Sequence, residues 1–213
     1  MTAAARWTLA VLLVFAGIGL AFWRQLDGPS RNAGPAGRPG PGYTPAQLAA
    51  ARARAGLPPC PAAPAIPAGP PVAALAGIEL PCAADGSPVQ VAAALAGRPV
   101  LLNLWAYWCG PCATELPALA QFARRAGNRV SVLTVHQDPN EAAGLERLAD
   151  LGVRLPTLQD GRRVIAAALA VPNVMPATVL LRGDGTVTAV LPLAFGSADE
   201  IAAAVSAKMG ALG

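Results

Sequence analysis

Residues 100–112 read Val-Leu-Leu-Asn-Leu-Trp-Ala-Tyr-Trp-Cys-Gly-Pro-Cys, a nearly continuous apolar run followed by two closely spaced cysteines. The apolar run over 100–105 predicts a strand that is buried on both faces of a parallel or mixed sheet. The apolar spacing over 111–125 then predicts a helix, with an expected kink at Pro117. The two cysteines are therefore expected where a buried strand passes into a helix.

This position suggests different roles for the two sulfurs. Cys109 is expected at or before the first helical turn, where unpaired backbone N–H groups and the helix dipole favour a thiolate. We therefore predict that Cys109 is the attacking sulfur. Cys112, one turn further on and directed inward, is predicted to resolve the mixed disulfide with a substrate. Pro111 is well tolerated in a first helical turn, and Gly110 leaves the approach to the sulfur open.

A Cys-x-x-Cys pair can also be a structural disulfide or half of a zinc site. Zinc in a structural site needs four ligands. The only histidine, His136, and the distant Cys60 and Cys82 do not supply a second Cys-x-x-Cys. We therefore predict a redox-active pair that uses no metal and no cofactor.

The surrounding sequence alternates between strand and helix patterns. Further strands are predicted at 74–80, 88–91, 130–135, 177–181 and 186–191, and helices at 140–151, 164–169 and 198–209. The last two strands are joined by Arg-Gly-Asp-Gly, which carries the Asp-Gly signal of a hairpin. This order predicts an α/β fold with a mixed central sheet flanked by helices and preceded by an N-terminal strand extension.

Residues 103–112, Asn-Leu-Trp-Ala-Tyr-Trp-Cys-Gly-Pro-Cys, resemble the active-site region of thioredoxin-like proteins. With the continuation Glu115-Leu116-Pro117, the sequence is most similar to the membrane-anchored TlpA/ResA group. The resemblance covers about residues 72–210. It implies a thioredoxin-like fold and a thiol-disulfide oxidoreductase that acts on protein disulfides or dithiols.

The resemblance also implies where a substrate lies. Pro176 matches the cis-proline that faces the dithiol in thioredoxin-like folds and helps to hold the substrate's backbone. The residues expected to contact the substrate are Trp108, Gly110, Pro111, Met175 and Pro176. Without the resemblance, Pro176 would be only a loop residue before a strand, and Trp108 only an aromatic core residue.

Three polar residues are candidates for supporting roles around the pair. Asn103 stands where cytosolic thioredoxins carry a buried carboxylate. Glu115, on the helical face of Cys112, is the candidate for proton transfer to or from that sulfur. The alternative for Glu115 is a surface glutamate near a helix N-terminus. For His136 we expect a solvated or hydrogen-bonded loop histidine in preference to a catalytic one.

Cys60 and Cys82 are predicted to form a structural disulfide. Such a disulfide would covalently link the end of the preceding linker to the first strand, and it would indicate an oxidising compartment. The alternatives are two free thiols, or a second pair that exchanges with Cys109.

Residues 7–23 form an uncharged apolar run between Arg6 and Arg24, with tryptophans at both ends. A helix of this length measures roughly 26 Å and nearly spans a hydrocarbon core. We predict a single-pass signal-anchor after a cytoplasmic stretch 1–6; a cleaved secretory signal is the alternative.

The remaining chain is expected to form a linker and one domain. Residues 24–71 are rich in Pro, Gly and Ala, which predicts a linker, with a short helix at 45–55. Residues 72–213 are expected to form the thioredoxin-like domain. The net charge of +4 comes from arginines that are scattered along the sequence, so there is no cluster of basic residues of the kind that binds nucleic acid.

The expected function is that of an extracytoplasmic reductase at the cell membrane, which draws electrons from a membrane donor of thiol type. The TlpA/ResA resemblance suggests a role in cytochrome c biogenesis, with apocytochrome c thiols as substrates. The alternatives are an oxidant of secreted-protein thiols, a peroxidase-related protein, or a non-catalytic binding module. The peroxidase signature Pro-x-x-x-Thr-x-x-Cys is missing from the sequence.

Overall fold

The computed structural model describes residues 43–63, 65–66 and 69–210. The predicted anchor 7–23, the cytoplasmic stretch 1–6 and the first part of the predicted linker lie outside these residues. Within the described ranges, no helix has both the length and the apolar character needed to cross a bilayer.

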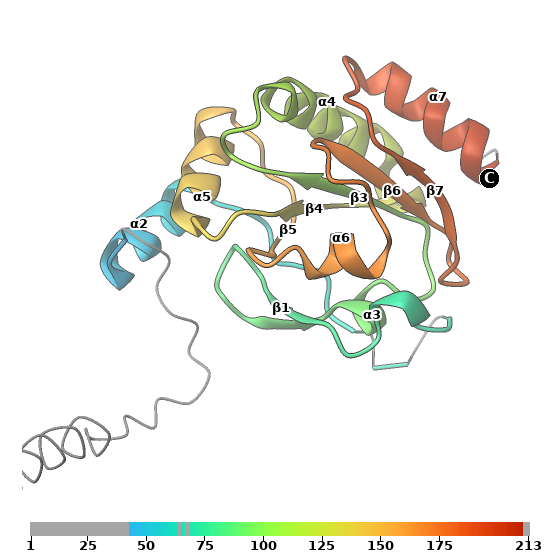
Figure 1. Ribbon diagram of the computed structural model, residues 1–213, viewed down its shortest axis with the longest axis horizontal. Coiled ribbons are helices and arrows are strands. Elements are labelled where there is room, and N and C mark those ends of the chain that lie inside the picture. The colour runs from blue at the N-terminus through green and yellow to red at the C-terminus, as the bar shows by residue number, and fades with distance from the viewer. Residues whose placement is uncertain (1–42, 64, 67–68, 211–213) are drawn as a thin grey trace, which may run out of the picture. The chain divides into compact units, whose positions relative to one another are not determined.

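A five-stranded mixed sheet forms the centre of the domain, in the order β5-β4-β3-β6-β7 (Figure 1). The strands are β3 Val100–Trp105, β4 Ser131–His136, β5 Thr157–Gln159, β6 Ala177–Leu181 and β7 Val187–Leu191. Strand β3 pairs in parallel with β4 and antiparallel with β6, and β6 and β7 form the predicted hairpin. Every residue of β3 is buried, which confirms the prediction of a strand covered on both faces.

The side chains of β3 alternate between two hydrophobic clusters, as the strand period of two requires. Leu101 and Trp105 belong to the cluster formed with α4 Gly110–Ala126 and α7 Ala198–Met209. Leu102 belongs to the cluster on the opposite face. That second cluster includes residues of β1 Glu79–Pro81, β2 Pro88–Gln90, α3 Val91–Ala94 and α6 Val164–Ala168. Figure 1 shows α4 and α7 on one side of the sheet and α3 and α6 on the other.

The N-terminal strand is shorter than the sequence predicts. Residues Ala73–Leu75 form a 3-10 turn, and β1 begins only at Glu79. Gly77, at φ 74°, lies in the left-handed region, so the extended strand expected from residue 74 does not form before Glu79. Strand β1 then pairs antiparallel with β2 and forms the predicted N-terminal extension.

Helix α2, Pro45–Ala55, has the predicted bounds but is packed on the domain. Its Ala51 and Ala55 join a small buried cluster with α5, Glu141–Asp150. Arg52 Nη2 donates to the Glu141 carboxylate at 2.8 Å. The packed part of the chain therefore begins before residue 72, the boundary expected from sequence. Because alanine has a small side chain, a buried helix face made of alanines is hard to recognise from the hydrophobic pattern of the sequence.

Candidate active site

The two closely spaced cysteines lie at the junction between β3 and α4, as predicted. The chain leaves β3 at Trp105, and Cys109 is the N-cap residue of α4. The backbone N–H of Cys112 donates to Cys109 Sγ, with N and S 3.2 Å apart. The two cysteines are joined in a disulfide. The helix N-terminus therefore directs a backbone donor at the outer sulfur, where it can stabilise negative charge.

The two sulfurs differ in their access to solvent. Cys112 is fully buried, whereas 5% of Cys109 remains exposed. Gly110 and Pro111 are exposed beside it, and apart from its chain neighbours and the nearby backbone of its own helix, no atom lies within 4 Å of where a side chain on Gly110 would begin. Cys109 is therefore the more accessible of the two cysteines, and Cys112 has no surface that a partner could contact.

Trp108 projects from the same loop and is 59% exposed. Its indole N–H donates to Asp138 Oδ2 at 2.9 Å. The other oxygen of Asp138 accepts from the backbone N–H of Asn140 at 2.8 Å. Asp138 thus fixes the orientation of the exposed indole ring of the residue that precedes Cys109. Sequence reasoning singled out Trp108 but missed Asp138, which lies 30 positions away in the loop after β4.

Met175 and Pro176 precede β6, and the peptide bond between them is cis. Leu104 is the register partner of Ala177, which places Pro176 beside the end of β3 from which the chain runs to Cys109. Met175 is half-buried and packs against the hydrophobic cluster that contains both active-site cysteines. The expected substrate-contacting residues therefore lie at one end of the sheet.

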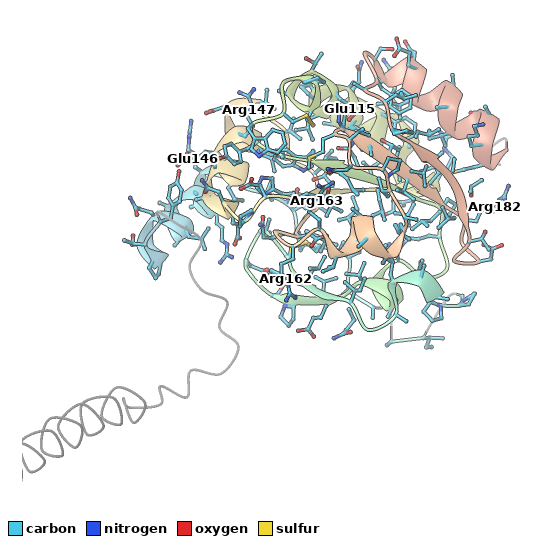
Figure 2. The ribbon with its side chains drawn as sticks, viewed as in Figure 1. Glu115, Glu146, Arg147, Arg162, Arg163 and Arg182 are labelled. Atoms are coloured by element: carbon cyan, nitrogen blue, oxygen red, sulfur yellow. A yellow bond between two sulfur atoms is a disulfide. The ribbon has the colours of Figure 1, made fainter. Side chains whose placement is uncertain are left out.

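Glu115 lies on α4 (Figure 2) and is completely buried, so the alternative of a surface glutamate was wrong. Its Oε2 accepts from Asn103 Nδ2 at 2.7 Å, and its Oε1 accepts from the backbone N–H of Phe195 at 3.1 Å. Burial raises the pKa of the Glu115 carboxyl above its ordinary 4.5, and the two N–H donors oppose this shift.

Asn103 fixes the orientation of this carboxyl. Its amide N–H2 group also lies 3.3 Å from the hydroxyl of Thr178 on the neighbouring strand. Its Oδ1 is buried and has no hydrogen-bond partner among the described residues. The position that the resemblance associates with a carboxylate thus carries a neutral donor, and the buried acid is supplied by Glu115 on the helix above it.

His136 ends β4 and is buried and hydrogen-bonded, so of the two expected settings, solvated or hydrogen-bonded, the structure has the second. Its Nδ1 lies 2.8 Å from Gln159 Oε1, while the amide N–H2 of Gln159 donates to the carbonyl of Asp138. This amide orientation assigns the proton of His136 to Nδ1. Burial lowers the pKa of His136, which favours the neutral ring. The ring packs on Trp105, with centroids 4.8 Å apart, as part of the core.

Cys60 and Cys82 form the predicted disulfide, which excludes the alternative of two free thiols. Cys82 belongs to the hydrophobic cluster on the face of the sheet opposite to Cys109 and Cys112. Because the sheet separates the two disulfides, the fold provides no route for direct exchange between them. In the described part of the chain, no group of three or more His, Cys, Asp or Glu side chains is arranged to hold a metal.

Comparison with known proteins identifies relatives with related chemistry. The family model described as Redoxin matches residues 62–203. The soluble secreted antigen MPT53 of Mycobacterium tuberculosis is 34% identical over 124 residues, which cover 58% of this chain and 70% of that protein. The thiol-disulfide oxidoreductase ResA of Bacillus subtilis is 31% identical over 98 residues, 46% of this chain and 54% of ResA. The match thus spans about half the length of ResA.

A solved structure with a similar fold is that of a secreted Mycobacterium tuberculosis disulfide oxidoreductase homologous to E. coli DsbE. Its TM-score is 0.55 at 27% identity, and the match covers 63% of this chain and 97% of that chain.

Proposed function

The chain belongs to the Redoxin family and is a thiol-disulfide oxidoreductase, and from this premise we propose that it reduces protein disulfides outside the cytoplasm. The observation that carries the proposal is the asymmetry of the cysteine pair. Cys109 lies at a helix N-terminus and keeps a small exposed surface, whereas Cys112 is buried one turn deeper. This arrangement suits one sulfur for attack and the other for resolution.

The reaction proceeds in two exchanges. In the reduced enzyme, the Cys109 thiolate attacks one sulfur of a substrate disulfide, forms a mixed disulfide and expels the other substrate sulfur, which takes up a proton. Cys112 then loses its proton and attacks Cys109 Sγ, which releases the second substrate sulfur. The substrate gains two electrons and two protons, and the enzyme is left with the Cys109–Cys112 disulfide. A membrane donor of thiol type returns the electrons by the reverse exchanges.

The substrate's backbone is proposed to lie across Met175 and Pro176, with Trp108, Gly110 and Pro111 on the other side of the sulfur. The exposure of Gly110 and Pro111 and the open space above Gly110 support this placement. The mixed disulfide would then form between these two groups of residues.

Glu115 is proposed to exchange a proton with Cys112 during resolution. It lies three residues further along α4 and is the buried carboxyl nearest to Cys112 in the helix sequence. Its raised pKa brings its titration closer to neutral pH, where a general base is most effective.

Glu115→Gln is expected to slow substrate reduction about 100-fold, because the amide cannot accept the Cys112 proton. The wild-type rate should rise with pH through the Glu115 pKa, above 4.5, and this limb should disappear in the variant.

The same raised pKa affects stability, because the folded state holds the Glu115 proton more tightly than the unfolded state. The stability that the protonated group contributes is therefore full below pH 4.5 and is lost as pH rises through the raised pKa.

Both effects are measured as pH profiles, one of reduction rate and one of unfolding free energy. Glu146→Gln, on helix α5, is the matched control and should leave both profiles unchanged (Figure 2). Parallel profiles for wild type and Glu115→Gln would rule out a proton-transfer role for this carboxyl.

The proposed setting is the outer face of the cell membrane. Residues 7–23 would anchor the chain, residues 24–71 would form the linker, and residues 72–213 would form the catalytic domain. The Cys60–Cys82 disulfide is the kind that persists in oxidising compartments, and the similar Mycobacterium tuberculosis proteins are secreted. The proposed substrate is the disulfide of apocytochrome c, which is reduced to the thiols that receive haem, as the resemblance to the TlpA/ResA group implies.

The midpoint potential of the Cys109–Cys112 pair tests the proposed direction of electron flow. We expect a value near or below about −270 mV, the potential of thioredoxin, which lies on the reducing side of the range of about −220 to −260 mV found for glutathione by extraction. Equilibration with thiol redox buffers, followed by alkylation and mass measurement, gives this potential. A value within that range or above it would instead assign the protein to the oxidation of secreted thiols.

A further inference from the structure

Arg163 spans two loops at the active-site end of the sheet. Its Nε donates to Gln137 Oε1 at 3.3 Å, and its Nη1 donates to Asn173 Oδ1. Gln137 follows directly after β4, and Asn173 lies in the loop that leads to the cis Met175–Pro176 bond. One guanidinium group therefore connects two segments that are distant in sequence.

The turn that carries Arg163 is firmly held. Asp160 is buried, and its carboxylate accepts from the backbone N–H groups of Val164 and Ile165, both at 2.9 Å. Its own N–H donates to the carbonyl of His136 at 2.8 Å. Arg163 lies between these contacts at φ 58°, a left-handed conformation that residues other than glycine seldom adopt. The fold thus keeps an arginine at a position where glycine would be less strained.

The contact with Gln137 leads back to the cysteine pair. Gln137 is 4% exposed, and its backbone N–H donates to the carbonyl of Trp105 at 2.8 Å. Trp105 is the last residue of β3, from which the chain runs to Cys109. Asn173, at the other end of the contact, is exposed. Arg163 therefore joins an exposed loop to a buried, fixed part of the site.

We propose that Arg163 is a positioning residue for polypeptide substrates, which holds the loop 172–175 at a fixed distance from the dithiol. This inference rests on the proposed function, in which Met175 and Pro176 hold the substrate's backbone. A planar guanidinium is suited to the task, because its donors have a fixed geometry and its charge strengthens both hydrogen bonds. A loop that is ordered before binding does not have to be ordered by the substrate.

Arg162 offers a matched control from the same turn. It is exposed and makes no hydrogen bond or ion pair with any residue that the structure describes. In Figure 2, Arg163 lies near the centre of the molecule, whereas Arg162 lies further out, towards β1. The two arginines carry the same charge and are adjacent in the chain, but they differ in their contacts.

The test uses reduction of insulin by the full chain, with Arg163→Gly, Asn173→Ala and the double variant. Glycine accepts the left-handed backbone, so Arg163→Gly removes the side chain without adding strain. We expect the KM for insulin to rise about tenfold, as for the loss of a charge-assisted hydrogen bond, with kcat within about twofold. Asn173→Ala should add little to Arg163→Gly, because both remove the same contact. Arg162→Gly should match the wild type.

Alkylation of reduced Cys109 by iodoacetamide is the second measurement, and its rate should be unchanged in all variants. The inference would be overturned by an unchanged KM in folded Arg163→Gly or by slower alkylation. It would also be overturned if the KM increases of Arg163→Gly and Asn173→Ala multiplied in the double variant. If the wild type itself fails to reduce insulin, the proposed function fails. If the wild type reduces insulin and Arg163→Gly does so with the same KM, only the role of Arg163 fails.

Discussion

Cys109→Ser is expected to lower disulfide reduction by more than about 1000-fold, because serine cannot form the mixed disulfide through which the electrons pass. The side chain lies at the N-terminus of α4 and is the only part of the pair that a partner can reach. Reduction of insulin with dithiothreitol as the electron donor measures the loss.

Cys112→Ser should behave differently, because it keeps the attacking sulfur and removes the resolving one. The variant is expected to accumulate a mixed disulfide with its substrate, visible as a mass increase that dithiothreitol reverses. Performed on the native membrane, the same experiment captures the physiological partners.

The matched control for both variants replaces Cys60 and Cys82 by serine. That pair lies on the opposite face of the sheet, so turnover should persist at temperatures where the variant is folded. Turnover that survives in Cys109→Ser, or a captured substrate attached to any other cysteine, would mean that the reacting sulfur has been misidentified.

The parts of the fold that the sequence predicts well are those with a strong local pattern. Helix Ala198–Met209 and strand Ala177–Leu181 have the predicted bounds, and β3 is buried throughout. In each case the hydrophobic period or a turn signal lies within the element itself. Strand Thr157–Gln159 was missed, because three residues are too few to show a period.

The parts of the site that the sequence does not predict depend on contacts between distant segments. The N–H that binds Glu115 belongs to Phe195, 80 positions away, and the acceptor for the Trp108 indole lies 30 positions away. The spacing within helix α4 places Glu115 on the face of Cys112, but whether that face is buried depends on the loop before α7. No local pattern contains this information, and only the tertiary structure distinguishes a buried acid from a surface glutamate.

Replacing both Cys60 and Cys82 by alanine is expected to lower the free energy of unfolding by about 3 kcal/mol. The two residues are 22 positions apart, and their bond removes conformational freedom from the unfolded chain over that whole loop. Cys82 is also fully buried, so alanine at this position forfeits some packing. Urea unfolding without reductant, followed by tryptophan fluorescence, measures the change.

Replacing Cys109 and Cys112 by alanine is the matched control, because that disulfide closes a loop with a separation of only 3. The loop model predicts a smaller loss of unfolding free energy there, about 2 kcal/mol, so the variant that lacks Cys60 and Cys82 should be the less stable of the two. An equal or reversed order would show that chain entropy is not the source of the stabilisation. Reaction of Cys60 or Cys82 with a thiol reagent in protein isolated without reductant would show that the bridge does not form, and the structural argument for an oxidising compartment would fall with it.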